Sequence, residues 1–442
     1  MVSEKLSKVS LGIATQENHN CFKQTEIGEI PKNWKVVQLD EVAASQRSSF
    51  TNGPFGSNLL KSELRSNGVP VIYIKDIKDG FYEPKEIVYV DESKADELSA
   101  CEVLPGDVLI TKVGDPPAIA SIYPDEADRA IVTQDVIRLR VDQDKCSPEF
   151  IRAVINSPLG RRLVKDISIE GTRKRVALGT FKKILVPLPP LPEQKSIAEI
   201  LSSVDEASAS TQAVIDQTRK VKQGLLQQLL TRGEHSDKKD VVGTKKAPLR
   251  LLDEVAKRVT GHTPNRKKPE YWDGGIKWVS LQDSAALDRV YIHETAAEIS
   301  EEGIRNSSAV KHPKGTVVLS RDAGVGKSAI TTDEMAVSQH FIGWICGLEL
   351  DNHYLYYWLQ YMKPFFEEIA IGNTIKTIGM PFFKSLKIPV PPIETQIQIA
   401  SILLSTDKQF FFAEEELERL NILKRGLMQD LLTGRVRVYS QE

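Results

Sequence analysis

The chain has 442 residues, 41% hydrophobic and 27% charged, a composition typical of soluble globular proteins with two or three domains. Its net charge of −2 excludes a polycation, so nucleic-acid binding would need local basic patches or help from partners. The four cysteines lie far apart without a CxxC pair, and no apolar run resembles a signal peptide or a membrane span. We therefore expect a cytoplasmic protein with no metal site, no disulfide and no contact with a membrane.

Two stretches of the chain repeat one another without a gap. VPLPPLPEQKSIAEILSSVD at 186–205 matches IPVPPIETQIQIASILLSTD at 388–407. Upstream the likeness is weaker but keeps its order, since PGDVLITKVG at 105–114 matches KGTVVLSRDAG at 314–324. The chain is therefore two tandem copies of one unit, each a variable globular region followed by a better-preserved tail.

The repeat divides the chain into six segments. In chain order these are an N-terminal extension (1–24), a first globular domain (25–191), a central long helix (192–232), a linker (233–248), a second globular domain (249–392) and a distal long helix (393–435). The linker is polar and has no periodicity, and it is long enough to let the second copy reverse its direction.

The first domain carries two incomplete catalytic motifs. DPPA at 115–118 resembles the D/N-P-P-aromatic motif of adenine-N6 methyltransferases, but its last residue, Ala118, cannot stack on a base. ESK at 92–94 matches half of a nuclease motif without a convincing upstream aspartate. We interpret the first motif as a proline-bounded turn and the second as a solvated charge cluster.

Both tails predict long helices, because no proline interrupts about forty residues and the spacing alternates between four and three. At 1.5 Å per residue each helix would be about 60 Å long, which favours two helices packed on each other. The alternative is two amphipathic helices, each packed on its own domain. The middle of the first stripe is polar, from Ser208 to Thr218, and Lys222 and Lys424 occupy equivalent positions. The predicted seam comprises Ile197, Leu201, Val204, Ile215, Leu225 and Leu229 of the central helix and Ile399, Leu403, Phe410, Leu417, Leu420, Leu427 and Leu431 of the distal helix.

In the second domain, GVGKS at 324–328 matches the end of a phosphate-binding loop. The full pattern is GxxxxGK[ST], and the position of its first glycine holds Arg321. The first copy has no Lys-Ser pair at the equivalent place. We interpret the stretch as a tight glycine turn after a strand; the alternative is a loop that presents Arg321 and Lys327 to a nucleic-acid backbone.

A two-copy chain with a variable domain before each proline-helix tail resembles the specificity subunit of type I restriction–modification systems. GPFGSNLLKSEL at 53–64 and GHTPNRKKPEYWDGGIKWVSLQD at 261–283 add to the likeness, which covers nearly the whole chain. The resemblance implies an α+β fold, with two mixed α/β target-recognition domains separated by an antiparallel coiled coil of two long helices. It implies no catalytic residue and no cofactor.

The same resemblance implies the partners. Such a protein reads a double-stranded DNA target in two halves and docks two adenine methyltransferase subunits, and motor-nuclease subunits join the complex. Two other classes of function stay open at this stage. One is an enzyme, a methyltransferase or nucleotide hydrolase, and the other is a coiled-coil scaffold or decoy without specific DNA recognition.

Sequence readout needs donors and acceptors such as Arg, Lys, Asn and Gln at groove depth. GTRKR at 171–175 and NTIKT at 373–377 occupy equivalent repeat positions, as do Gln134 and Gln339. Each candidate is alternatively a solvated surface residue. The candidates are Arg47, Ser49, Asn52, Ser57, Lys75, Lys112, Gln134, Thr172, Arg173, Lys174 and Arg175 in the first domain, and His262, Thr263, Asn265, Arg266, Lys267, Lys268, Gln282, Arg321, Lys327, Gln339, Thr374 and Lys376 in the second. We expect Phe50, Phe55, Tyr271 and Trp272 to lie in the core or anchor loops, with a DNA contact by Trp272 as the alternative.

Overall fold

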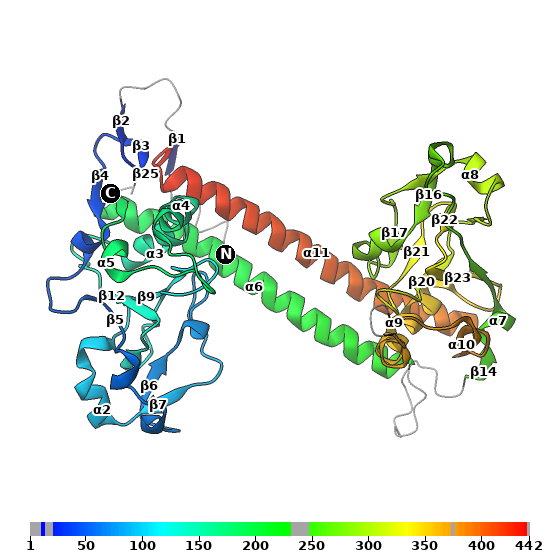
Figure 1. Ribbon diagram of the computed structural model, residues 1–442, viewed down its shortest axis with the longest axis horizontal. Coiled ribbons are helices and arrows are strands. Elements are labelled where there is room, and N and C mark those ends of the chain that lie inside the picture. Colours follow the sequence, from blue (N-terminus) through cyan, green and yellow to red (C-terminus); the bar gives the residue numbers. More distant parts are fainter. Residues whose placement is uncertain (1–9, 14–20, 231–246, 373–375, 440–442) are drawn as a thin grey trace. The chain divides into compact units, whose positions relative to one another are not determined.

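A computed structural model of the chain describes residues 10–13, 21–230, 247–372 and 376–439. These residues divide into two units (Figure 1). Unit 1 contains the described residues up to Gln212 and from Glu415 onward, and unit 2 contains those from Ala213 to Glu414. Each unit therefore holds one globular domain and part of each long helix. The α+β fold expected from the sequence is confirmed.

The domain of unit 1 is built on two four-stranded sheets. One sheet is antiparallel, in the order β10-β9-β12-β5, and the other, β7-β6-β11-β8, contains the parallel pair β6 and β11. Further antiparallel pairs are β4 with β13, β2 with β3 and β1 with β25. The strands are β1 (Ser10–Ile13), β2 (Phe22–Thr25), β3 (Gly28–Pro31), β4 (Lys35–Gln38), β5 (Phe50–Asn52), β6 (Val69–Ile72), β7 (Val88–Val90), β8 (Glu102–Val103), β9 (Val108–Thr111), β10 (Ala120–Ile122), β11 (Ala130–Val132), β12 (Val136–Leu139), β13 (Leu185–Leu188) and β25 (Val436–Tyr439); the helices are α2 (Glu92–Glu97), α3 (Pro148–Asn156), α4 (Pro158–Ile167) and α5 (Leu178–Phe181).

The domain of unit 2 repeats this plan with different side chains. Its sheets have the orders β15-β23-β20-β21-β17 and β18-β16-β22-β19, and β14 pairs with β24. The strands are β14 (Leu249–Leu251), β15 (Ala256–Thr260), β16 (Trp272–Val279), β17 (Tyr291–Ile292), β18 (Glu298–Ile299), β19 (Lys311–His312), β20 (Val317–Ser320), β21 (Ser328–Thr331), β22 (Met335–Val337), β23 (Phe341–Cys346) and β24 (Lys387–Pro389); the helices are α7 (Leu252–Val255), α8 (Glu301–Arg305), α9 (Asn352–Ile369) and α10 (Met380–Lys384).

The two long helices are α6 (Leu191–Leu230) and α11 (Ile393–Leu431), and each continues from one unit into the other. In unit 1, Ile197 and Leu201 of α6 share a hydrophobic core with Met428 and Leu431 of α11 and with the domain. In unit 2, the last turns of α6 share a core with the first turns of α11. The helices are therefore antiparallel within each unit, and each helix packs both on a domain and on the other helix.

Every residue of the predicted seam is buried or half-buried. Two polar residues along the seam, Lys222 and Lys424, each form an ion pair with an aspartate of the other helix. In unit 1, the Lys424 Nζ lies 2.7 Å from Asp205 Oδ1, and in unit 2 the Lys222 Nζ lies 2.5 Å from Asp407 Oδ1. From outside the helix pair, Arg152 of the first domain also contacts Asp205, and Tyr357 of the second domain also contacts Asp407. A buried charge placed this way fixes which turns of two helices face each other.

A buried glutamine joins the first domain to the start of α6. The Gln194 side chain is fully buried. Its Nε2 donates to the carbonyl oxygens of Pro189 at 2.8 Å and Lys145 at 3.2 Å, and its Oε1 accepts from the Ser147 backbone N–H at 3.0 Å. One amide therefore satisfies buried backbone groups on both sides of the joint.

Gln396 makes the equivalent joint in unit 2. Its Nε2 donates to the carbonyls of Pro391 and Glu349, both at 2.8 Å, and its Oε1 accepts from the Asp351 N–H at 2.9 Å. The repeated P-P-x-x-x-Q pattern of the two tails thus encodes the same attachment twice.

The end of α11 differs from the predicted distal helix, which extends to residue 435. The helix ends at Leu431, and Gly434 has a φ of +71°, a backbone conformation that favours glycine. A Cβ at this glycine would lie 2.4 Å from Pro31. The chain then turns into β25, which pairs with β1 inside the predicted N-terminal extension.

The Glu193 carboxylate of α6 binds one side chain from the segment before the sheets of unit 1 and one from the segment after α11. Glu193 is buried and accepts hydrogen bonds from Trp34 Nε1 at 3.0 Å and from Arg437 Nε at 2.6 Å and Nη2 at 2.9 Å. Bidentate guanidinium–carboxylate pairs are among the stronger polar contacts in proteins. The segments near both ends of the described chain are therefore structural parts of unit 1.

We predict that Gln194→Leu destabilises unit 1 by about 2 to 4 kcal/mol, because each buried backbone group left without a partner costs about 1 to 3 kcal/mol. Calorimetric unfolding of the full chain measures the loss as a lowered transition temperature. Gln217→Leu, at an exposed position of the same helix, is the control and should stay within about 0.5 kcal/mol of the parent. Equal effects of the two substitutions would contradict the role of the joint.

Candidate nucleic-acid interface

In the first domain, loops from distant parts of the chain meet at one end of β9. The Lys112 N–H donates to the Asp135 carbonyl at 2.8 Å, and the Lys112 carbonyl accepts from Val176 at 3.0 Å. Gly114 donates to the Lys174 carbonyl at 3.0 Å. These bonds bring together the segments after β9 and β11 and the GTRKR segment. We name the surface formed by Lys112, Gln134, the loop 53–57 and residues 172–175 the domain-1 face.

The second domain builds the same junction at the end of β20. The Arg321 N–H donates to the His340 carbonyl at 3.0 Å, and the Arg321 carbonyl accepts from Ile378 at 3.0 Å. Ala323 donates to the Lys376 carbonyl at 3.2 Å. We name the surface formed by Arg321, Gln339, Lys376 and the loop 261–268 the domain-2 face. Thr374, a candidate from the sequence, lies outside the described residues.

A glycine lets one further loop join each face. A Cβ at Gly53 would lie 2.2 Å from the Thr133 backbone, and a Cβ at Gly261 would lie 1.6 Å from the Val337 carbonyl oxygen. Both distances are impossible for a side chain, so only glycine permits this approach. The loops that begin at these glycines are thereby placed against Gln134 and Gln339.

The structure places most candidates of the first domain at exposed positions. Arg173, Arg175, Thr172, Gln134 and Ser57 are exposed on the domain-1 face, and Lys112 and Lys174 are half-buried there. Lys174 Nζ lies 3.4 Å from Asp115 Oδ1. Lys75 is exposed in the loop that follows β6, the parallel neighbour of β11, and lies 3.3 Å from Glu86. The exposed side chains of the domain-1 face thus include two arginines, Arg173 and Arg175, and one glutamine, Gln134.

Three candidates of the first domain do not fit this surface. Ser49 is buried and its hydroxyl donates to the Gln46 carbonyl at 2.7 Å. Arg47 is exposed, but it precedes β5. The first residue of β5, Phe50, pairs with Leu139, which lies at the end of β12 that is farther from Lys112. Asn52 is half-buried, and its Nδ2 donates to the Gly53 carbonyl at 2.9 Å. Ser49 is therefore buried away from the domain-1 face, Arg47 lies outside that face, and Asn52 bonds within the loop.

On the domain-2 face, the basic loop is exposed from Asn265 to Lys268, as is His262, and Thr263 is half-buried. Gln339 and Lys376 are exposed, and Arg321 is half-buried with its Nε 3.6 Å from Asp322 Oδ1. Gln282 is exposed in the turn that follows β16, the parallel neighbour of β22. His262, Thr263 and Asn265 line an open polar pocket of about 620 Å³ together with Arg305 and Asn306.

Lys327 is a candidate from the sequence whose ammonium group instead bonds within the domain. Its Nζ donates to the carbonyl oxygen of Ser284 at 3.0 Å and to the hydroxyl at 2.9 Å, so it holds the β20–β21 hairpin to the neighbouring turn. The backbone N–H groups of Gly326, Lys327 and Ser328 also donate within the domain. A phosphate-binding loop needs these groups free, so the GVGKS stretch is a glycine turn rather than a nucleotide site.

The aromatic residues divide between core and surface. Phe50 is buried beside Phe181, and Trp272 donates from Nε1 to the Asn265 carbonyl at 3.3 Å, which anchors the basic loop. Tyr271 is half-buried. The prediction for Phe55 was wrong, since its side chain is 69% exposed in the loop of the domain-1 face.

An apolar pocket of about 370 Å³ lies beside Gln134, lined by Leu59, Leu64 and Tyr73 among others. Burial raises the pKa of Tyr73, which keeps its phenol neutral. An apolar hollow beside an amide suits contact with the methyl group and edge of a base rather than with a phosphate.

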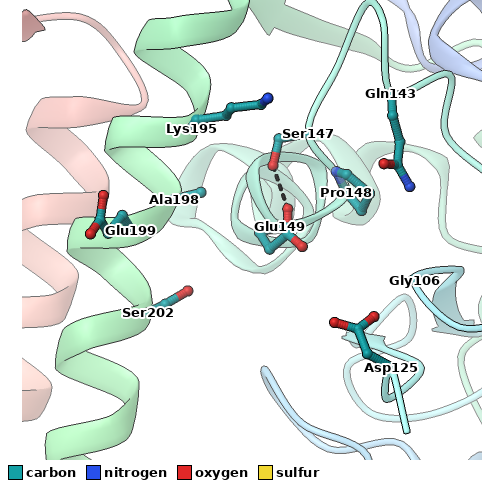
Figure 2. A pocket seen from close by; sticks show the side chains of 10 residues that line it. All are labelled: Gly106, Asp125, Gln143, Ser147, Pro148, Glu149, Lys195, Ala198, Glu199 and Ser202. Atoms are coloured by element: carbon teal, nitrogen blue, oxygen red, sulfur yellow. Dashed lines mark hydrogen bonds between the residues drawn. The ribbon is translucent and has the colours of Figure 1, made fainter. Parts of the chain in front are cut away.

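A polar pocket lies elsewhere in unit 1. The pocket has a volume of about 420 Å³, and Lys195, Glu199, Glu149 and Gly106 are among the residues that line it. Figure 2 shows Lys195 of α6 across from Ser147 and Glu149. Gly106 precedes β9 whereas Lys112 follows it, so this pocket lies at the opposite end of the strand from the domain-1 face.

Other motifs that could suggest catalysis have structural roles. Lys94 of the ESK stretch contacts Glu97 at 2.9 Å and Glu63 at 2.8 Å, as expected of a charge cluster. Within the described part of the chain, no group of three His, Cys, Asp or Glu side chains could hold a metal ion. No helix among these residues is long and apolar enough to cross a membrane.

Comparison with known proteins gives the faces their context. The sequence family described as the type I restriction modification DNA specificity domain matches residues 31–218 and 249–421 of this chain. The chain is 26% identical over 428 residues to a protein assigned as the MjaX type I restriction enzyme specificity subunit of Methanocaldococcus jannaschii, covering 94% of this chain and 97% of that one. It is 22% identical over 439 residues to the EcoBI specificity subunit of Escherichia coli, covering 92% and 86% of the two chains.

The fold is similar to that of the crystallised S subunit of a type I restriction–modification system from M. genitalium. The TM-score is 0.60 at 14% identity, covering 90% of this chain and 96% of that one. The two matches to the family's domain and the curated relatives define the chain as a two-domain DNA-specificity protein. It belongs to the type I restriction–modification specificity family and carries two copies of the family's domain, so its role is DNA sequence specificity rather than catalysis.

We predict that Arg173→Ala lowers DNA affinity about equally for all sequences and reduces the slope of log affinity against log salt by about 0.9, as expected when one phosphate contact is lost. The measurement is a salt titration of the full chain assembled with its methyltransferase subunits. Lys195→Ala, at the exposed rim of the pocket beyond the other end of β9, is the matched control and should leave the slope unchanged. An unchanged slope in Arg173→Ala would remove this residue from the interface.

Proposed function

We propose that the domain-1 face and the domain-2 face each read one half of a bipartite double-stranded DNA target. The supporting observation is that the two faces share a frame of backbone hydrogen bonds while their side chains differ. Lys112 corresponds to Arg321, Asp135 to His340, and Lys174 to Lys376 in this frame. A common frame with different donors and acceptors is what two modules of one kind need in order to recognise different sequences.

The exposed side chains divide into two roles. The exposed cations Arg173 and Arg175 on the domain-1 face and Lys376 on the domain-2 face suit phosphate oxygens, which set the position of the protein on the duplex. Gln134 and Gln339 occupy equivalent central positions and suit base edges, because an amide carries a donor and an acceptor side by side. The remaining exposed candidates, including Lys75 and Gln282, add contacts next to these two glutamines.

The helix pair is the proposed platform for two adenine methyltransferase subunits, which motor-nuclease subunits would join, acting on DNA in the cytoplasm. Exposed apolar side chains along α6 and α11 support this role, since a partner that packs on the helices can bury them. Val221 is 43% exposed, Phe412 66% and Ile422 55%, all off the seam. A solved relative of similar fold, with a TM-score of 0.54, comes from work on complex assembly of the type I restriction–modification system.

Replacing residues 252–386 by the same region of another family member should change one half of the recognised sequence and leave the other half unchanged. These boundaries keep β14 and β24 native, so the attachment to the helix pair is preserved. Methylome sequencing of cells that express the chimera with the methyltransferase subunits reads both halves at once. Loss of any defined motif would favour a scaffold without specific recognition, and a change in both halves would refute independent readout.

The length of the helix pair should set the distance between the half-sites. One heptad inserted after Gln212 and one after Glu414 lengthens the pair by about 10 Å at 1.5 Å per residue. Since ten base pairs span about 34 Å, the spacer should grow by about three base pairs. The added pairs rotate one half-site by about a quarter to a third of a turn, so some affinity is lost. A variant that binds well with the original spacer would show that the helices do not measure the distance.

A further inference from the structure

A chain of hydrogen bonds crosses the domain-2 face. The Thr263 hydroxyl lies 2.5 Å from Gln339 Oε1, and Gln339 Nε2 lies 3.4 Å from His340 Nε2. The other ring nitrogen, Nδ1, lies 2.9 Å from Asp322 Oδ2, and Thr377 contacts the second oxygen of the same carboxylate. Asp322 is 8% exposed and Gln339 is exposed, so the chain runs from a buried acid to a surface amide.

The chemistry of these groups gives the chain a direction. A carboxylate accepts hydrogen bonds, so Nδ1 of His340 carries the proton that Asp322 accepts. In the neutral ring Nε2 is then an acceptor, and the Gln339 amide donates to it. The Thr263 hydroxyl donates to Oε1. Both bonds favour the same orientation of the Gln339 amide, which an isolated glutamine would not keep.

After these bonds, Gln339 has one N–H and one lone pair of Oε1 left, both at an exposed position. This pair matches the major-groove edge of adenine, where N7 accepts and the 6-amino group donates. Guanine offers two acceptors on that edge and leaves the Oε1 lone pair unmatched. We propose that Gln339 reads an adenine in the half-site bound by the domain-2 face, and that His340, held by Asp322, is the positioning residue that selects adenine over guanine.

The domain-1 face lacks this device at the equivalent backbone positions. Asp135 stands where the second domain has His340, and Val113 stands where it has Asp322. An ionised aspartate has no proton to donate to a carboxylate, as His340 donates to Asp322, and valine offers no carboxylate. Gln134 is therefore not oriented by this mechanism.

The inference rests on the proposed function, and the experiment separates the two. Methylome sequencing with the parent chain first defines the two half-sites; the absence of a bipartite motif would refute the proposed function itself. The full chain assembled with its methyltransferase subunits is then offered a pool of duplexes in which the first half-site is fixed and the second is randomised. Sequencing of the bound fraction gives base preferences even for variants of lower affinity.

The parent should require adenine at one position of the second half-site. Gln339→Glu should lose that preference about ten- to a hundredfold and gain cytosine there, since a carboxylate accepts from the cytosine amino group but cannot donate to N7. His340→Phe keeps a planar ring but removes both nitrogens, so the amide can rotate. Its adenine-over-guanine preference at the same position should fall about tenfold, while other positions keep theirs.

Lys314→Gln is the control: Lys314 is exposed before β20, at the opposite end of that strand from Arg321, and the variant changes the charge by −1 as Gln339→Glu does, so every position of the second half-site should be unchanged. A role of His340 in folding alone would lower binding to all duplexes by the same factor and leave the base preferences intact, which would overturn the positioning role. An unchanged adenine preference in Gln339→Glu, or a parent second half-site without a required adenine, would overturn the readout by Gln339.

Discussion

The hydrogen bonds of Gln194 and Gln396 are the contacts on which the arrangement of each domain depends, because each joins a globular domain to the first turn of a long helix. The proline run before each helix makes this possible. Proline has no N–H to satisfy, so the run can enter a buried joint while its carbonyls remain available to the glutamine amide. A displaced joint would move the whole face of that domain, since the strands that carry the face share a core with the same helix.

The repeat allowed much of this organisation to be predicted from the sequence. The two long helices and their seam follow from spacing alone, and the positions of Lys222 and Lys424 in the seam are explained by the aspartates that they meet. Gln134 and Gln339 are distinguished in the sequence because they coincide between the copies. The contacts of Glu193 with Trp34 and Arg437 could not be predicted, because no local pattern links residues separated by 159 and 244 positions.

Three of the candidates, Arg47, Ser49 and Lys327, lie outside the two named faces or bond within the domain, and the physical cause is the same for each. Arg47 and Ser49 are close in sequence to the loop at Gly53, yet a strand of three residues separates them from it and carries them to the other end of the sheet. Lys327 has the composition of a surface cation, but its partner Ser284 comes from another segment. His340 is not among the candidates from the sequence, because its proposed positioning role depends on a contact with Asp322. Only the pairing of β20 with β23 brings the two side chains together. Composition indicates the kinds of contact, and topology decides which residues make them.

The faces also show how specificity can change without loss of the fold. The bonds that bring the loops together are made by backbone groups of Lys112, Arg321 and their partners, so they survive most side-chain replacements at those positions. The exceptions are Gly53 and Gly261, where a Cβ would collide with the neighbouring backbone. A domain built this way can exchange donors and acceptors at groove depth while its loops keep their places. Because backbone groups hold the loops and the proposed base contacts are made by side chains, the side chains of the two domains are free to diverge. The two helices, which hold both domains, are expected to stay alike.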